Sequence, residues 1–343
     1  MITAASFREL HDELAALGSF EAPTYRSWVK FLVCVGLSLA VVGQVYVASS
    51  AWALLWLFPA SILMGAAIMI GHEAAHGAAC EKAWQNDLLV TVAFGVLSGI
   101  SALFWKHKHN VLHHGSPNIP GKDRDLLLGP IAVTKEQYDA RPGLQWFARN
   151  LQGYVLWPLT ALLAPLMRVR TFVVLFEAAR AGKIDRVWLN DAVAVSLHYT
   201  LWLAVPTYFF GFAWAFAVYF VVFCGVSLML SYIFMLGHTG LPLVGEFDDR
   251  WSLQILTSRN VRLGVVGRFF WVGLDAQLTH HLFPKISHFK LPATRDAVNR
   301  WCARHGFAYV EQDVVSSTVD VAKHLFVSWK DVPVDLRRAI AAK

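Results

Sequence analysis

The chain has 343 residues, of which 56% are hydrophobic and only 16% are charged, and it contains 14 Trp and 23 Phe. Because average soluble domains are less apolar and carry about 25% charged residues, this composition excludes an ordinary soluble protein and indicates an integral membrane protein. The net charge of +6 suits a membrane surface or an acidic partner, and the positive-inside rule alone could produce it. We expect membrane lipid as a partner and no nucleic acid.

The predicted helices follow in chain order. Residues 1–27 are expected to form an amphipathic, charged N-terminal helix that lacks the apolar stretch of a secretory signal. Four later runs are long enough to cross a bilayer at about 20 residues each, namely about 28–48, 51–71, 191–210 and 213–236. Only "SS" separates the first two runs and only "GF" the last two, so we expect two helical hairpins, over 28–71 and 191–237.

Lysine and arginine predict the orientation. They are concentrated before, between and after the hairpins, whose outer turns carry no charge, so both termini and the long intervening segment are expected on the cytoplasmic side. Two weaker apolar runs, 88–104 and 151–178, are interrupted by glycine, proline or arginine. We expect both to lie in the membrane interface or to dip into it, without crossing.

Eight of the 14 histidines stand at or just beyond the predicted cytoplasmic helix ends. They occur in "GHEAAHG", "HNVLHHG", "MLGHTG" and "QLTHHLFP". The eight are His72, His76, His109, His113, His114, His238, His280 and His281. Imidazoles this dense would be costly to desolvate near lipid without metal or other partners, so we predict that they bind metal.

The spacing of these histidines predicts two metal ions. His72 and His76 are four residues apart, as are His109 and His113, so each pair shares one face of a helix. The neighbouring histidines in "LHHG" and "THHL" are about 100° apart on a helix, so each such pair reaches two adjacent ions better than one. Eight imidazoles also exceed what a single metal ion takes from a protein.

The ligand type and the surroundings favour iron. Imidazole suits Zn, Cu, Fe and Ni, and the four cysteines are far apart, with no CxxC pair to form a thiolate site. Two redox-active metal ions beside an apolar interior indicate oxidation of an apolar substrate by O2, with the protein supplying position and seclusion. We therefore predict two non-heme iron ions, with O2 as co-substrate.

The predicted fold class is an all-α integral membrane protein: four transmembrane helices in two hairpins, interfacial helices, and a cytosolic helical cap that carries the di-metal site. We expect the whole chain, 1–343, to form one domain. Its parts are the N-terminal helix 1–27, the first hairpin 28–71, the cytosolic and interfacial segment 72–190, the second hairpin 191–237 and the cap 238–343.

The sequence resembles the membrane-bound fatty acid desaturase family. "GHEAAHG", "HNVLHHGSPNIPGKDRD" and "QLTHHLFPKISHFKLP" are similar, in order and spacing, to the three histidine boxes of that family, and His238 stands where the family has an additional iron ligand. The resemblance runs from about residue 50 to 295. Two features depart from the common pattern: the third box opens with Gln277, as in the front-end subgroup, and Asp275 stands where Asn is common.

This resemblance implies a non-heme di-iron oxidoreductase that uses O2 and two electrons to insert a double bond into a fatty acyl chain. No His-Pro-Gly-Gly heme segment occurs in the sequence, so we expect a separate electron donor of the ferredoxin or cytochrome b5 type. The boxes do not encode the chain length, the bond position or the carrier, which would be acyl carrier protein, coenzyme A or an intact lipid. Basic residues such as Lys106, Lys108, Arg168 and Arg170 are candidates to dock any of the three carriers.

Further residues are candidates to orient the ligands without binding metal themselves. They are Glu73, Asn118, Asp123, Asp125, Asp275, Gln277 and His288. A lone histidine in an apolar helix is more often hydrogen-bonded than metal-bound, so we expect His198 to be structural. His107 lies about 200° around the helix from His109 and is expected to face away from it.

Other functions remain open at this point. The same histidine-rich scaffold supports hydroxylases, ketolases and acetylenases. The literal "HEAAH" is typical of a zinc protease, with Glu73 as general base and Asp275 as the further acidic ligand that it needs, but this function leaves five box histidines unused. A heme protein would need single histidines facing across a bundle, and a metal carrier would need ligands along a route through the membrane.

Overall fold

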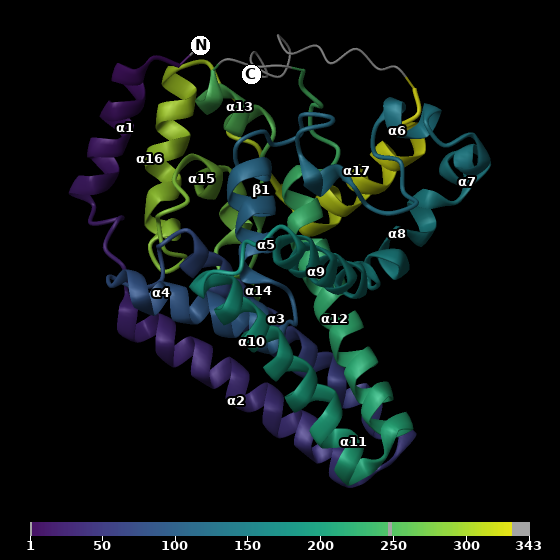
Figure 1. Ribbon diagram of the computed structural model, residues 1–343. Coiled ribbons are helices and arrows are strands. Elements are labelled where there is room, and N and C mark those ends of the chain that lie inside the picture. Colours follow the sequence, from purple (N-terminus) through teal and green to yellow (C-terminus); the bar gives the residue numbers. More distant parts are fainter. Residues whose placement is uncertain (1, 246–248, 331–343) are drawn as a thin grey trace. The chain divides into compact units, whose positions relative to one another are not determined.

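The computed structural model describes residues 2–245 and 249–330 (Figure 1). Within these residues the secondary structure is helical apart from β1 (Asn260–Arg262) and β2 (Glu311–Asp313), which pair in parallel. Together with the candidate spans described below, this confirms the predicted all-α membrane class. The end of the predicted cap, residues 331–343, lies outside the described residues.

The chain divides into two compact units. The membrane unit comprises Pro23–His107 and Pro158–Ser231, and the polar unit comprises Met1–Ala22, Lys108–Trp157 and Tyr232–Lys343. Residues 72–107 and 158–190, which the sequence analysis placed in the segment between the hairpins, therefore belong to the same unit as the transmembrane runs.

Four segments of the described chain are long and apolar enough to cross a membrane, and they correspond to the four predicted runs. They are Thr24–Ala48, Ala51–Ala75, Arg186–Phe210 and Phe212–His238. Their elements are α2 (Thr24–Ala48), η1 (Ala51–Trp56), α3 (Leu57–Ala75), α10 (Arg186–Tyr199), η6 (Thr200–Ala204), α11 (Val205–Phe210) and α12 (Phe212–His238). Each segment extends beyond the predicted run. The turns between them are as short as predicted, with Gly211 alone between α11 and α12.

Two further helix pairs are sharply bent. α4 (Ala83–Val90) and η2 (Thr91–Leu97) are followed, at an angle of 113°, by α5 (Ala102–Lys106) and η3 (His107–His113). α8 (Gln152–Thr160) and α9 (Leu163–Arg180) meet at 59°. These pairs contain the two weaker apolar runs. Bends of this size suit broken spans or re-entrant segments, and their placement in the membrane interface stays a prediction.

Buried hydroxyl groups join the helices of the membrane unit. α2 packs along α3 (Figure 1), and Ser38 Oγ donates to the Ala60 carbonyl across this contact at 2.8 Å. Ser61 Oγ lies 2.7 Å from the Leu57 carbonyl on its own helix and 3.0 Å from the Val222 carbonyl on α12. Because lipid offers no hydrogen-bond partners, polar groups of a membrane-embedded bundle need such internal bonds.

Two expectations about residues of the membrane unit are tested by the structure. His198 is structural, as predicted: its Nδ1 lies 3.0 Å from the Val96 carbonyl and its Nε2 lies 2.9 Å from the Tyr219 hydroxyl. Arg168 is not available to dock an acidic partner, because it is 5% exposed and donates from Nε to the Ser98 carbonyl. That interpretation was wrong because the sequence does not distinguish an inward-pointing arginine from an outward-pointing one in a broken apolar run.

In the polar unit, α1 (Ala4–Ala16) packs against α16 (Leu291–Arg304). Leu10 and Leu14 are fully buried in a core that also contains Trp301. The Trp301 indole donates from Nε1 to the Ser6 carbonyl at 2.9 Å, which satisfies its polar atom inside this core. The apolar face of the amphipathic N-terminal helix is thus buried against protein.

The polar unit also contains further helices, one of which, α15, carries the third histidine box. In the described chain these are η4 (Arg124–Leu126), α6 (Lys135–Asp139), η5 (Pro142–Leu144), α7 (Gln145–Asn150), α13 (Arg250–Leu256), α14 (Val265–Trp271), η7 (Leu274–Ala276), α15 (Gln277–Leu282) and α17 (Val314–Val327). The strand pair aligns Asn260 with Glu311 and Arg262 with Asp313. It joins the segment that precedes the third box to the segment that precedes α17.

The close approach of η2 to α10 leads to a first prediction. A Cβ atom at Gly95 would lie 2.5 Å from the Cβ of Ala194, whereas one at Gly36 on α2 would meet nothing within 4 Å. We expect Gly95→Ala to lower the free energy of unfolding by about 1–3 kcal/mol through overpacking, and Gly36→Ala to cause no loss. Thermal unfolding of the two purified variants in detergent measures the difference; equal melting temperatures would contradict the expectation.

A second prediction concerns the pH dependence of the polar unit. His324 on α17 donates from Nε2 to the Val133 carbonyl at 3.0 Å, and burial lowers the pKa of His324 below its ordinary value of 6.5. The stability that this neutral histidine contributes is complete above pH 6.5 and is lost as the pH falls below it, because the unfolded chain then binds the proton more readily.

We therefore expect the melting temperature to fall from about pH 7 to about pH 5, and to fall less in His324→Gln. His305→Gln, at an exposed histidine of the same unit, is the control. The same pH profile in His324→Gln and in the wild type would show that this histidine does not contribute.

Candidate metal centre

Six of the eight predicted ligand histidines belong to the polar unit, and they form two groups. The first group consists of His113, His238 and His281, and the second of His109, His114 and His280. Within each group, one ring nitrogen of every member lies within 4.8 Å of those of the others. Both pairs of neighbouring histidines are divided between the groups, as expected if each pair serves two ions.

Two imidazoles of the first group are held through Nδ1 by acceptors on α13 or next to it. His238 Nδ1 lies 2.8 Å from the Thr257 backbone carbonyl, and His281 Nδ1 lies 2.7 Å from Gln254 Oε1. Since both partners accept a hydrogen bond, each ring carries its proton on Nδ1 and keeps a lone pair on Nε2. Gln254 in turn donates from Nε2 to the His114 carbonyl at 2.9 Å, which fixes the orientation of its amide.

A buried carboxylate holds the third imidazole. His113 Nδ1 lies 3.1 Å from both carboxylate oxygens of Asp123, which is 3% exposed and also accepts the Asn118 backbone N–H at 2.9 Å. Burial raises the pKa of Asp123, but the facing imidazole and the hydrogen bonds lower it by more, so the pKa lies below its ordinary value. Asp123 is therefore ionised at neutral pH, and His113 Nε2 is buried without a hydrogen-bond partner.

The three rings of the first group converge. The ring centroids are 4.7 Å apart for His113 and His238, 4.5 Å for His238 and His281, and 5.0 Å for His113 and His281. Gln277 Nε2 lies 2.8 Å from His238 Nε2, so this residue contacts one of the predicted ligands. Three buried imidazoles, each with a ring nitrogen within 4.8 Å of those of the others, form a set of nitrogen donors suited to Zn, Cu, Fe or Ni.

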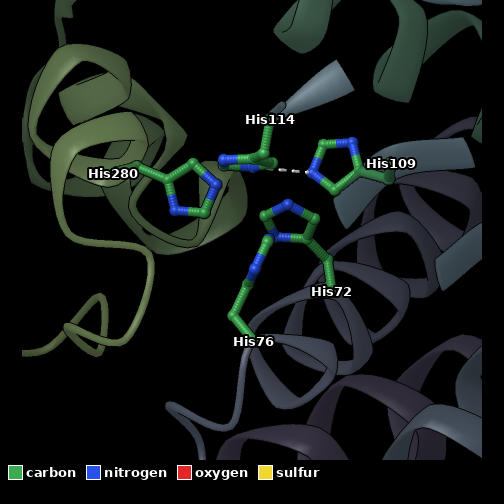
Figure 2. Close-up of side chains that lie close together, drawn as sticks. All are labelled: His72, His76, His109, His114 and His280. Carbon is green, nitrogen blue, oxygen red and sulfur yellow. Dashed lines mark hydrogen bonds between the residues drawn. The ribbon is translucent and has the colours of Figure 1, made fainter. Parts of the chain in front are cut away.

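The second group has the same kind of donors but differs in exposure. His109 and His280 are 2% and 4% exposed, whereas His114 is half-buried. His114 Nε2 lies 3.2 Å from His109 Nε2, the contact marked by a dashed line in Figure 2, and the His280 ring lies 5.0 Å from that of His114. Asp125 approaches His109 Nδ1 at 3.9 Å and forms an ion pair with Lys108.

The other two predicted ligands lie at the end of α3, in the membrane unit. His72 and His76 are one helical turn apart, and their ring centroids are separated by 4.9 Å (Figure 2). His72 is 1% exposed and packs edge-on against Trp105 at 5.4 Å, whereas His76 is half-buried. Glu73, between them, is 5% exposed. The spacing of four residues therefore brings the two imidazoles together on one helix face.

Two of the residues proposed to orient the ligands have clear partners. Asn118 Nδ2 donates to the His238 backbone carbonyl at 3.1 Å, so it contacts a predicted ligand residue. Asp275 forms ion pairs with Arg295 at 2.7 Å and with Arg268 at 3.5 Å. These guanidinium groups balance a buried carboxylate, which is a structural role for Asp275.

His288 and His107, which also stand close to the boxes in the sequence, lie outside both groups. His288 is 9% exposed and its ring lies 3.9 Å from that of Phe289. His107 is exposed on η3, as expected from its angle around the helix.

Gln254 and Arg259 contact the first group or its helix and were missed by the sequence analysis. Arg259 is 1% exposed and donates to the Leu236 carbonyl at 2.6 Å and to the Thr239 carbonyl, on either side of His238. Burial lowers the pKa of Arg259 to about 10, so the guanidinium stays charged at neutral pH and stabilises the C-terminal end of α12. The sequence feature that could have indicated them is the presence of Gln254 and Arg259 inside the stretch "LQILTSRNV", among apolar residues.

The fold and the site define a helical membrane protein in which buried histidines present their ring nitrogens in groups. Residues 18–313 match the sequence model of the family described as "Fatty acid desaturase". The chain belongs to this family, and the resemblance stated from its histidine boxes is confirmed.

Curated relatives come from several kingdoms of organisms. The chain is 26% identical over 269 residues to the "Acyl-lipid (9-3)-desaturase" of Physcomitrium patens, covering 75% of this chain and 49% of that protein. It is 28% identical over 273 residues to the "Delta(5) fatty acid desaturase fat-4" of Caenorhabditis elegans, covering 74% and 60%. It is 27% identical over 263 residues to the "sn-1 linoleoyl-lipid 6-desaturase" of Synechocystis, covering 70% of each. The chain thus spans about half to two thirds of the first two relatives.

The buried carboxylate beside His113 leads to a prediction about metal affinity. Asp123→Asn removes the charge and introduces an amide that can donate to the ring, so the proton is no longer fixed on Nδ1. We expect the affinity for Fe2+ to fall by about 10–100-fold, as for other partners of metal-bound histidines. Titration of the metal-free protein with Fe2+ measures this, and Asp296→Asn, at an exposed aspartate of α16, is the control. Unchanged affinity in Asp123→Asn would count against the assignment.

Proposed function

We propose that the protein is a membrane-bound oxidoreductase that introduces a double bond into a fatty acyl chain, with two non-heme iron ions as cofactor and O2 as co-substrate. Membership of the fatty acid desaturase family and the desaturases among its curated relatives support the acyl substrate and the reaction. The proposal of a metal centre rests on one observation. Three buried imidazoles are held through Nδ1 by a carbonyl, an amide oxygen or a carboxylate, and their rings converge.

The proposed iron ligands are the histidines of the boxes and the histidine that ends α12. They are His72, His76, His109, His113, His114, His238, His280 and His281. Eight imidazole nitrogen donors fit two ions of ordinary coordination, and imidazole is a suitable ligand for iron. His72 and His76 are assigned to the centre on their motif and spacing.

When iron is bound, the centre supplies the oxidising power that an unactivated methylene group requires. Overall, O2 accepts four electrons: two come with the two hydrogen atoms removed from adjacent methylene carbons, and two come from an external donor. Two protons from solvent complete the two water molecules that form. Asp123 and Gln254 keep the ligand protons on Nδ1, so that Nε2 of His113 and of His281 can bind metal.

We propose that the electrons come from a separate ferredoxin or cytochrome b5 type protein. The acyl chain would be carried by acyl carrier protein, coenzyme A or a membrane lipid. The chain would cross the membrane several times, with the histidines and both termini on the cytoplasmic side, as the distribution of lysine and arginine supports.

The alternatives have less support. A hydroxylase, ketolase or acetylenase would use the same ligands, and the reaction product distinguishes them from a desaturase. An intramembrane zinc protease would need Asp275 as a ligand beside the HEAAH motif, but this carboxylate is paired with Arg295 and Arg268.

Lipid analysis of cells that express the protein tests the proposal. We expect new acyl chains that lack two hydrogens, detected by mass spectrometry of lipids and of carrier-bound acyl chains. His113→Ala should abolish this product and lower the bound iron while the protein remains folded, because it removes a ligand at the centre of the first group. His107→Ala, at an exposed histidine of the same helix, is the matched control. A product that gains oxygen would indicate a hydroxylase, and full activity of His113→Ala would overturn the ligand assignment.

A further inference from the structure

The sharp bend before the second histidine box is held by side chains from two other helices of the membrane unit, α9 and α10. The bend connects η2, which ends at Leu97, to the helix that starts at Ala102. At its centre Gly99 has a φ of +66°, and a Cβ there would lie 2.5 Å from His198 Cδ2. A glycine is therefore needed both for the backbone conformation and for the approach of α10.

Asp191 on α10 binds the start of the helix that follows the bend. It is 3% exposed; its Oδ1 accepts the Ala102 N–H at 2.8 Å and its Oδ2 accepts the Leu103 N–H at 3.3 Å. Ser101 Oγ donates to the same carboxylate and accepts the Phe104 N–H at 3.0 Å. The first N–H groups of a helix lack internal partners and carry a partial positive charge, so a buried carboxylate is well placed there.

Arg168 on α9 binds the end of the helix that precedes the bend. Its Nε donates to the carbonyl of Ser98, the residue that follows η2, at 2.9 Å. The guanidinium also lies over the rings of Phe223, at 4.2 Å, and Tyr219, at 5.2 Å. A cation at the C-terminal end of a helix meets the partial negative charge of the last carbonyls. Each of the two buried charges thus lies at a helix end whose partial charge is opposite to its own.

Two neutral contacts complete the arrangement. Thr171 Oγ1 on α9 accepts the Ser101 N–H at 3.0 Å, and His198 Nδ1 on α10 donates to the Val96 carbonyl at 3.0 Å. We call Arg168, Thr171, Asp191 and His198 the bend clamp. The polar groups of a turn on a protein surface can be hydrogen-bonded by water, whereas burial of an aspartate and an arginine in a membrane protein costs free energy. A turn alone does not require this cost.

We infer that the bend clamp positions the second histidine box, with Asp191 and Arg168 as positioning residues for the metal centre. This inference rests on the proposed function. The helix that Asp191 starts continues without a break to His113 and carries His109 on the way. Its first residue and its axis are fixed by the clamp, so a change at Asp191 is transmitted along about three helical turns to the imidazoles. None of the clamp residues belongs to a candidate metal-binding group of the described chain.

The test compares Asp191→Asn with Ser61→Ala in the purified full-length protein. Asn has one acceptor oxygen in place of two and no charge, so it cannot hold all the donors at the start of the helix. Ser61→Ala removes a buried hydroxyl of the same unit that bonds Leu57 and Val222 and does not contact the bend. We expect Asp191→Asn to lower Fe2+ affinity by about tenfold or more and to speed amide hydrogen exchange over residues 102–113. Ser61→Ala should lower only the melting temperature.

Milder variants keep the test decisive if Asp191→Asn fails to fold. Thr171→Val removes one acceptor of the clamp and should shift iron affinity and exchange in the same direction by a smaller amount. Arg168→Lys, which keeps the charge, should retain more iron than Arg168→Met. The inference would be overturned if folded Asp191→Asn or Thr171→Val bound iron as tightly as the wild type, even though its melting temperature was as low as that of Ser61→Ala or lower. A wild-type protein that binds no iron would instead overturn the proposed function, while hydrogen exchange would still decide whether the clamp orders the helix.

Discussion

The arrangement of the polar unit depends on one chemical constraint: a buried imidazole must have one nitrogen held if the other is to be offered to a metal. Asp123, the Thr257 carbonyl and Gln254 meet this constraint for the first group of histidines. The helix that carries Gln254 is itself capped by Asp249, which accepts backbone N–H groups from Trp251 and Ser252 and from Ile2 near the N-terminus. The N-terminal residues, α13 and the third box therefore form one connected network of hydrogen bonds.

The membrane unit solves a different problem, which is to keep polar side chains bonded where lipid offers no partners. Ser38 and Ser61 bond to carbonyls of neighbouring helices, and Asp191 and Arg168 bond to helix ends. Asp191 lies where one helix of the bent segment begins and Arg168 lies where the other ends. We infer that the same buried hydrogen bonds stabilise the bundle and place the second box.

Much of the fold follows from the sequence. The four apolar runs, the short joints "SS" and "GF", and the pairing of histidines at one helical turn all correspond to local patterns that a helix imposes on its residues. The hydrogen-bond partners of the proposed ligands could be predicted from the sequence only in part. Asp123 was found because it follows the second box closely, whereas Gln254 and Arg259 act on histidines far from them in the chain, and the Thr257 contact uses a backbone carbonyl that carries no side-chain signal. Arg168 was misread for the same reason, since its partner, Ser98, is 70 residues away.

The most direct test of the account is the metal content of the purified wild-type protein, measured by elemental analysis together with optical and Mössbauer spectra. We expect two non-heme iron ions per chain, bound by nitrogen ligands, and no Soret band. One zinc ion per chain and no iron would contradict it and would favour the chemistry of the HEAAH motif taken alone.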